Sequence, residues 1–197
     1  MRTSFFVYMS IAGQKHKKLN IAEIGVYKGD NAMSMLTSTD NIDKLYLIDT
    51  YEPYYKWFTD EIGAVFSPEK AEIFFETTKK RFEIYNGKVS FIRKDSSLTA
   101  QDFPDSYFHY VYIDGGHDYD IVKKDINAWY PKVKELGVLG GHDSVYPDVS
   151  TAIIEFATSN KLTVHFVNAI RNGLTYPEVN NFEDWWILKV PCLTCLT

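Results

Sequence analysis

Short apolar runs alternate with helix-forming segments along the 197-residue chain, and this alternation restricts the fold more than any other feature of the sequence. Five runs read as strands, at 19–25, 44–49, 88–95, 108–114 and 136–141. Strands that alternate with helices form parallel sheets with right-handed crossovers, and helices then cover both faces. The sequence therefore predicts a three-layer α/β sandwich around a mostly parallel sheet.

The segments between the runs carry helix signals. Ser67 and Pro68 suit the N-cap and first position of a helix. Another predicted helix follows the fourth run, and its apolar residues at helical spacing are Val122, Ile126, Trp129 and Val133. No helix pattern separates the last two apolar runs, 162–167 and 183–190, so the chain is expected to end in a hairpin-like pair of strands over 162–190. At this length, residues 1–197 are expected to form one domain.

Composition excludes several classes of function. The net charge is −5, and no long basic cluster is present, so a nucleic-acid partner is not expected. No stretch approaches the roughly 20 apolar residues needed to span a bilayer, so no membrane association is expected. The chain contains two cysteines, Cys192 and Cys195, and we interpret them as incidental in a reducing compartment. A cytoplasmic location is therefore expected.

The tetrapeptide Gly-Gly-His-Asp occurs twice, at 115–118 and at 140–143. The flanking residues differ, and no sustained period surrounds the two copies, so they are not an internal repeat. Each copy lies where a predicted strand ends. Ligands of open α/β sheets bind beyond the carboxyl ends of the strands, so we expect both copies to contribute to one site.

The first run ends in the turn 23–30, in which Glu23, Gly25 and Gly29 form E-x-G-x-x-x-G and Tyr27 lies between the glycines. Glycines at a strand-to-helix turn let a ligand approach the backbone closely. The nicotinamide dinucleotide fingerprint is G-x-G-x-x-G, and this turn departs from it. A dehydrogenase is therefore the weaker interpretation.

Two further strand ends carry polar residues. Asp49 ends the second run, where a carboxylate can accept hydrogen bonds from ribose hydroxyls, or can cap the following turn. Asp95 and Ser96 end the third run, where they can bind an adenine edge, while a serine-capped helix start is an equally ordinary explanation.

Together, the glycine turn, Asp49, the segment IDGGHDY (113–119), WYPKV (129–133) and GVLGGHD (137–143) resemble the class I S-adenosylmethionine-dependent methyltransferases. The resemblance is strongest to the branch with macrocin-type sugar O-methyltransferases and cephalosporin-hydroxylase-like proteins, and it covers about residues 19–160. It implies a Rossmann-like sheet of seven strands with an antiparallel last strand. It also implies that S-adenosylmethionine binds with its methionine end at the glycine turn, its ribose at Asp49 and its adenine near Asp95 and Ser96.

In metal-dependent members of that branch, residues at the ends of the fourth and fifth strands bind a divalent cation. The corresponding residues are Asp114, His142 and Asp143. Magnesium, the metal the resemblance favours, prefers oxygen ligands, whereas an imidazole suits manganese or zinc better. Either His142 binds a softer metal, or the two aspartates hold magnesium and His142 has another role. With Asp114 and His142, the third catalytic candidate is His117, as a general base or a helix cap.

The sequence thus predicts an O-methyltransferase that acts on a hydroxyl of a sugar or another small metabolite and is assisted by a divalent metal. A non-catalytic binding protein with the same fold is the alternative. Because little sequence precedes the first predicted strand, a second subunit could complete the substrate pocket, so a homo-oligomer remains open. Aromatic residues at 51–58 and a loop at 168–182 are candidate walls for the acceptor, although the aromatics can equally pack the loop onto the sheet.

Overall fold

The computed structural model describes residues 2–52, 67–168 and 182–190. Seven strands form one sheet in the order β3-β2-β1-β4-β5-β7-β6. Their bounds are Leu19–Ile24 (β1), Ile42–Ile48 (β2), Val89–Ile92 (β3), Phe108–Ile113 (β4), Val133–Gly141 (β5), Val164–Asn168 (β6) and Phe182–Leu188 (β7). The three-layer α/β sandwich predicted from the alternating pattern is confirmed, and so is the Rossmann-like sheet of seven strands that the resemblance implied.

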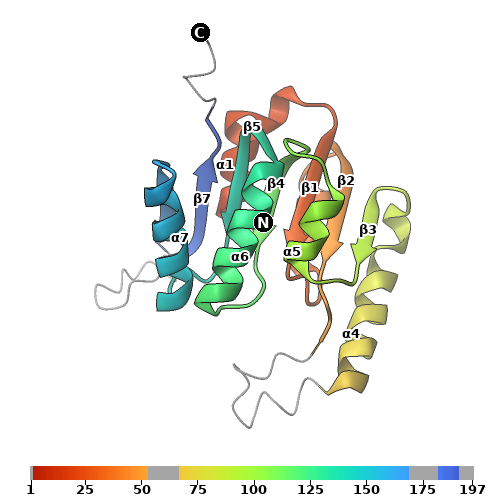
Figure 1. The fold of residues 1–197 in the computed structure, drawn as a ribbon. Coiled ribbons are helices and arrows are strands. Elements are labelled where there is room, and N and C mark those ends of the chain that lie inside the picture. Colours follow the sequence, from red (N-terminus) through yellow and green to blue (C-terminus); the bar gives the residue numbers. More distant parts are fainter. Residues whose placement is uncertain (1, 53–66, 169–181, 191–197) are drawn as a thin grey trace.

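Strands β1 to β5 are parallel, whereas β7 runs antiparallel to both of its neighbours, β5 and β6. The reversed arrow of β7 is visible in Figure 1. The register pairs Ile24 with Ile113 and Ile113 with Gly141, so β1, β4 and β5 end level with one another. The residues that follow these strands are therefore brought to one edge of the sheet.

Helices cover both faces of the sheet. On one face, α6 (Tyr119–Trp129) and α7 (Pro147–Ser159) pack against the strands around the fully buried Trp129, and both lie in front of the sheet in Figure 1. On the other face, α1 (Thr3–Ile11), α2 (Asp30–Ser38) and α4 (Pro68–Arg81) enclose a second apolar cluster. The short helix α5 (Ser96–Thr99) follows β3, and four single 3-10 turns complete the helical segments of the described chain.

The start of α4 is confirmed. Ser67 is its N-cap, and the serine hydroxyl accepts a hydrogen bond from the amide of Lys70 at 3.4 Å. Pro68 takes the first helical position, where the missing amide hydrogen has no partner to lose. Three basic residues lie in the last turn, where they interact favourably with the helix dipole.

Two expectations need correction. Val133 was predicted on the buried face of a helix, but α6 ends at Trp129, and Val133 begins β5, paired with Phe108. Pro131 ends the helix because it lacks an amide donor, and β5 consequently starts three residues before the predicted position, Leu136. The chain before β1 forms the helix α1, which packs on the sheet with Phe5 and Tyr8 buried.

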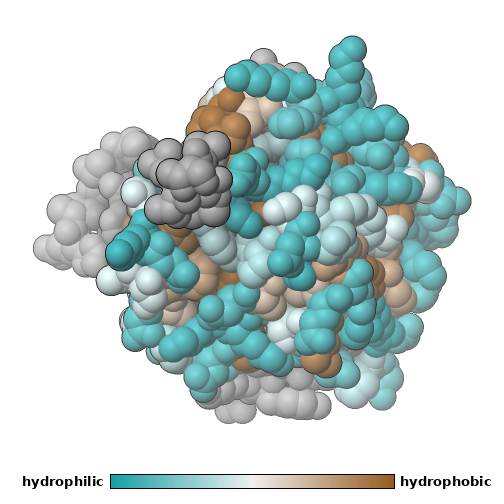
Figure 2. Space-filling model, turned by 45° about the horizontal axis from the view of Figure 1, so that its top comes forward, coloured by the Kyte–Doolittle hydropathy of each residue, from teal (hydrophilic) through white to brown (hydrophobic). Residues whose placement is uncertain are grey.

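The surface shown in Figure 2 is mostly hydrophilic, with small separated groups of hydrophobic residues, as is ordinary for a folded domain. Within the described residues, no helix is long and apolar enough to cross a membrane. Both cysteines, most of the 51–58 aromatics and nearly all of the 168–182 loop lie outside the described residues.

Candidate functional site

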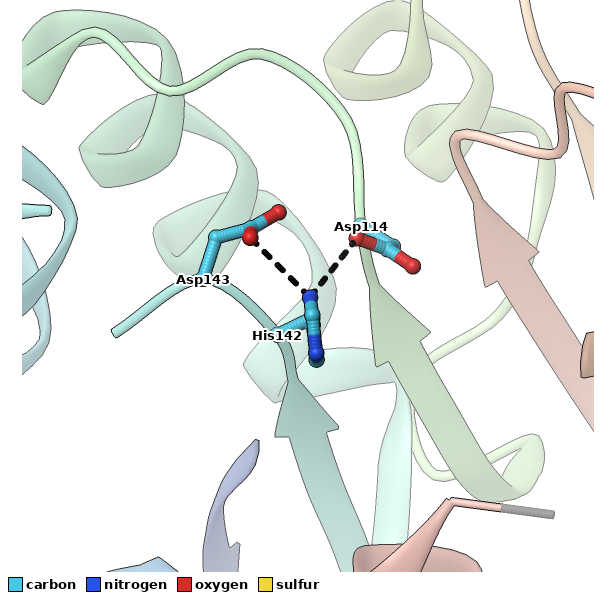
Figure 3. A group of neighbouring side chains, drawn as sticks. All are labelled: Asp114, His142 and Asp143. Atoms are coloured by element: carbon cyan, nitrogen blue, oxygen red, sulfur yellow. Dashed lines mark ion pairs between the residues drawn. The ribbon is translucent and has the colours of Figure 1, made fainter. Parts of the chain in front are cut away.

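The ends of β4 and β5 bring together Asp114, His142 and Asp143, whose ligand atoms all lie within 4.8 Å of one another. Figure 3 shows Asp114 directly after β4, His142 directly after β5, and both carboxylates turned toward the imidazole. The Nδ1 atom of His142 lies 3.0 Å from Asp143 Oδ1 and 3.7 Å from Asp114 Oδ1. The three residues predicted to bind a metal therefore converge, although they come from two separate segments.

The electrostatics of this cluster reflect two carboxylates held close together. Burial and the neighbouring Asp143 raise the pKa of Asp114, His142 and Arg2 oppose the shift, and the net result is a pKa of about 6. Burial acts in the same direction on Asp143, but hydrogen bonds from His117 and His142 outweigh it and hold the pKa below its usual value. Burial would lower the pKa of His142, yet the two aspartates raise it above the ordinary value. The cluster thus favours positive charge at its centre.

His117, from the first Gly-Gly-His-Asp copy, reaches the second copy. Its Nε2 atom lies 2.6 Å from Asp143 Oδ2, and its ring lies against Tyr146 at 5.1 Å between centroids. His117 precedes the N-cap of α6, which is Asp118, so it is not that cap. Asp143 holds His142 through Oδ1 and His117 through Oδ2, and both copies therefore contribute to one site.

The glycine turn after β1 lies beside this cluster. Gly25 has a φ of +79°, and a Cβ atom there would lie 2.1 Å from the carbonyl oxygen of Asp114, so only glycine fits between the ends of β1 and β4. Gly29 has a φ of +74° and starts α2. Tyr27 also has a positive φ, of 50°, and nearly half of its side chain is exposed.

Glu23 is buried beneath the turn. Only 2% of its surface is exposed, and burial raises the pKa of its carboxyl well above the usual value. Asn31 donates a long hydrogen bond to Oε1 at 3.4 Å, while Oε2 has no hydrogen-bond partner among the described residues. Glu23 therefore has one buried carboxyl oxygen, Oε2, that can still form a hydrogen bond.

Asp49 connects the ends of β1 and β2. Its Oδ2 atom accepts hydrogen bonds from the backbone amides of Val26 and Tyr27, and its Oδ1 atom accepts one from the amide of Tyr51. The hydrogen bond from the amide of Tyr51 is the turn cap that was the alternative role of Asp49. Each carboxylate oxygen can accept more than one hydrogen bond, so the contact with a ribose remains a proposal.

Asp95 and Ser96 begin α5, and their side chains already have protein partners. Asp95, not a serine, is the N-cap: its Oδ1 atom accepts hydrogen bonds from the amide of Leu98 and the hydroxyl of Ser97. The hydroxyl of Ser96 donates to Asp125. A contact between these two residues and a ligand stays a prediction.

A cavity of about 440 Å³ runs along the strand ends between these groups, within the usual range for small-molecule sites. Its lining includes Gly25, Tyr27, Asp49, Asp95, Ser96, Asp114 and His117, all predicted site residues. Glu23, Gly29, His142 and Asp143 are predicted site residues that do not line it. The cluster of Asp114, His142 and Asp143 borders the cavity, because Asp114 belongs to both and His117, which contacts Asp143, lines the cavity.

Sequence reasoning missed three residues. Arg2, which precedes α1, places its guanidinium 3.3 Å from Asp114 Oδ2. Asp184 on β7 accepts hydrogen bonds from the amide of Thr3 and the hydroxyl of Tyr112. Asp125 on α6 lines the cavity. The sequence did carry a signal for Asp125: an aspartate on the apolar face of a predicted helix, beside Ile126 and Trp129, is unusual unless it has a partner.

A family model described as "Methyltransferase domain" matches residues 22–144, which contain the glycine turn, the residues that line the cavity and the cluster of Asp114, His142 and Asp143. The chain belongs to this methyltransferase family. The match begins just before Glu23 and ends just after Asp143, so it includes every predicted site residue. A search of curated proteins gives no significant match.

Solved structures share the fold of this methyltransferase domain. A structure assigned as a caffeoyl-CoA O-methyltransferase from Staphylococcus aureus superposes with a TM-score of 0.62 at 16% identity, over 95% of this chain and 82% of that chain. The O-methyltransferase NovP gives 0.64 at 13% identity, over 93% and 76%. A spermidine synthase from Thermotoga maritima gives 0.54 at 15% identity, over 95% and 60%. Because the identities are this low, the similarities show the fold alone. The third protein, moreover, is named for a different reaction.

Proposed function

We propose that this methyltransferase domain transfers the methyl group of S-adenosylmethionine to a hydroxyl group of a sugar or another small metabolite, assisted by a divalent cation. The narrower proposal is membership of the branch that includes macrocin-type sugar O-methyltransferases. The observation that carries the proposal is the convergence of Asp114, His142 and Asp143 at the border of a cavity beside the glycine turn. The family match supports methyl transfer, and the cluster supports a hydroxyl acceptor.

The cavity suits the methyl donor. Gly25 keeps the backbone at the β1 end free of side chain, and Asp49 lies at the β2 end, where the ribose would contact it. Asp95 and Ser96 lie beyond it at the β3 end. The proposed order of methionine end, ribose and adenine thus follows the order of the strands β1, β2 and β3 in the sheet.

The donor set of the cluster suits a divalent cation. Two carboxylates and one imidazole are common ligands of manganese and zinc, and the carboxylates alone suit magnesium. The raised pKa of Asp114 has burial and a neighbouring carboxylate among its causes, and a cation would relieve both effects. When bound, such a cation would lower the pKa of an acceptor hydroxyl and orient it.

His117 is the proposed general base. The acceptor oxygen attacks the sulfonium methyl carbon, the bond from sulfur to that carbon breaks, and S-adenosylhomocysteine leaves. The hydroxyl proton passes to the imidazole of His117. Asp143, whose Oδ2 atom lies 2.6 Å from Nε2, orients the ring. Because Asp143 contacts both histidines, its replacement is expected to affect metal binding and proton transfer together.

The test is calorimetric titration of chelator-treated protein, first with S-adenosylhomocysteine and then with magnesium, manganese and zinc. Donor-site binding near 1 μM, about −8 kcal/mol, is expected, with metal binding to the complex that is lost in Asp143→Ala. Asp148→Ala is the matched control, because Asp148 is an exposed aspartate in the first turn of α7 and is not part of the cluster.

Each outcome decides a different part of the proposal. No binding of S-adenosylhomocysteine, with NAD bound instead, would favour a dehydrogenase. Binding without methyl transfer to any hydroxyl compound in a screen would favour a non-catalytic binding protein. Full activity of Asp114→Asn and Asp143→Asn in chelator would show that the metal is not required.

A further inference from the structure

Asp125 is a buried acidic residue in the part of the cavity lined by Ser96, which follows β3, and Gly115, which follows β4. It lies on α6, only 5% of its surface is exposed, and it belongs to the cavity lining. Transfer of a carboxylate out of water is unfavourable unless a partner compensates. Burial accordingly raises the pKa of Asp125 to about 6. A residue with this energetic disadvantage in a binding cavity is a candidate for ligand recognition.

Among the described residues, one of the two carboxylate oxygens of Asp125 has a hydrogen-bond partner. Oδ1 accepts the hydrogen bond from the Ser96 hydroxyl. Within residues 2–52, 67–168 and 182–190, no hydrogen bond to Oδ2 is found, and a Cβ atom at Gly115 would lie 4.0 Å from Oδ2. One acceptor therefore faces the cavity from a nearly buried side chain.

The surroundings of Oδ2 suit a flat heterocycle. Ile24, Ile48 and Ile121 provide apolar walls, and Gly115 adds no side chain between Ile24 and Asp125. The other acidic residue in this part of the cavity, Asp95, is engaged by the start of α5 and lies 3.6 Å from the ammonium of Lys124. Asp125 is thus the acidic group available to a ring that lies in this part of the cavity.

We propose that Asp125 recognises the exocyclic amine of the adenine of the methyl donor and selects adenine against bases that carry a carbonyl at the same position. This inference rests on the proposed function, since it assumes that the cavity binds an adenosyl compound. A carboxylate oxygen accepts a hydrogen bond from an amine but repels a carbonyl oxygen. Sites built around a buried hydrogen-bonding group reject analogues that leave the group unpaired.

A purely structural role for Asp125 makes a different prediction. The hydrogen bond from Ser96 links α6 to the start of α5, and an asparagine at 125 would keep it, because its amide oxygen also accepts. A structural residue would therefore tolerate Asp125→Asn with no change in base preference. In contrast, an asparagine that faces a ligand can present either its carbonyl or its amide, so it would accept both kinds of base.

The experiment compares the affinities of S-adenosylhomocysteine and S-inosylhomocysteine by calorimetry for the unmodified protein, Asp125→Asn and Asp120→Asn. S-inosylhomocysteine differs only in its base, which carries a carbonyl in place of the amine. Asp120 is the matched control, because it lies on the same helix, is exposed and does not line the cavity. The unmodified protein and Asp120→Asn are expected to prefer the adenosyl compound by about 10- to 100-fold, the loss associated with an unmet charged hydrogen bond.

In Asp125→Asn the preference is expected to fall to within about threefold, with S-adenosylhomocysteine still bound. An unchanged preference in Asp125→Asn, or no preference in the unmodified protein, would overturn the role of Asp125 and leave the proposed methyltransferase activity intact. Failure of the unmodified protein to bind either compound would instead refute the proposed donor, and the inference with it. Circular dichroism of each variant confirms that the comparison is made on folded protein.

Discussion

Asp143 is the residue on which the geometry of the metal cluster depends. Its backbone has a φ of 60°, in the left-handed region that aspartate tolerates better than most residues. This conformation follows immediately after β5 and accompanies carboxylate contacts with His142 on one oxygen and His117 on the other. Local backbone strain at such a position is common where side chains must converge on a ligand.

Asp125 gives a prediction about pH and stability. Its pKa is raised to about 6 in the folded protein, from an ordinary value of about 3.8, so folding favours the protonated form. The stabilising effect is present at low pH and is lost as the pH rises from about 4 to about 6. Asparagine does not titrate, so the free energy of unfolding of Asp125→Asn, relative to the unmodified protein, should increase by up to about 3 kcal/mol between pH 4 and pH 7.

Urea unfolding at both pH values measures this difference. Subtracting the two proteins at each pH removes the contributions of the other ionisable groups, including Asp143, whose lowered pKa acts in the opposite sense. A difference that does not change between pH 4 and pH 7 would contradict the burial effect assigned to Asp125.

Individual site residues were predictable where they end a strand. Asp114, His142 and Asp143 each lie directly after or close to a strand end, and a parallel sheet brings such positions together without further information. Arg2 was not predictable, because its contact with Asp114 spans 112 positions and depends on the packing of α1. The engagement of Asp49 with three backbone amides also depends on tertiary structure, since two of those amides belong to another strand-to-helix turn.

At the scale of elements, α1 has the least expected position. Its sequence, TSFFVYMSI, is apolar on all sides, so the spacing of its residues gives no buried face. In the structure, the buried face of α1 is the one that packs on the sheet. Phe5 and Tyr8 pack near Tyr110, and the hydroxyl of Ser4 lies 2.7 Å from that of Tyr110. Elements with a clear helical period, such as α6 and α7, were predictable from spacing alone.

The attachment of α1 to the sheet can be tested through Asp184. Its Oδ2 atom accepts a hydrogen bond from the amide of Thr3 at 2.6 Å, and its Oδ1 atom accepts one from the hydroxyl of Tyr112 at 3.1 Å. Asp184→Ala leaves the buried Tyr112 hydroxyl without this partner, so it is expected to lower the free energy of unfolding by about 1–3 kcal/mol.

A double-mutant cycle with Tyr112→Phe separates this contact from the general effect of truncating Asp184. Once the Tyr112 hydroxyl has been removed, Asp184→Ala should cost at least about 0.5 kcal/mol less, as measured by chemical unfolding. Equal costs in both backgrounds would show that the hydrogen bond between Tyr112 and Asp184 adds no stability.

For the whole molecule, the family resemblance implied a sheet of seven strands with an antiparallel last strand, and the structure confirms both. The alternating pattern alone predicts parallel strands and layers, but it does not say that the last strand enters the sheet between β5 and β6. That position depends on pairing between strands distant in sequence, such as Gly141 with Trp185. The local spacing of apolar residues does not predict which distant strands pair.

Ligand binding should stabilise the whole domain, because the cavity and the metal cluster both form only when the strand ends are aligned. At 100 times its dissociation constant, S-adenosylhomocysteine is expected to add about 2.7 kcal/mol to the free energy of unfolding. For a chain of this size, that corresponds to a rise of roughly 5–11 °C in melting temperature. Manganese should give a further rise that is absent in Asp143→Ala, and differential scanning calorimetry measures both effects.

The position of β7 also has a consequence for how the protein is made on the ribosome. Strand β6 bonds to no strand but β7 among the described residues, and β7 is the later of the two in the chain. During translation, β6 therefore emerges before its partner exists, and the nascent sheet ends at β5 with an unpaired edge. Such edges pair readily with other chains, so the interval before residues 182–188 leave the exit tunnel is when this protein most needs a chaperone.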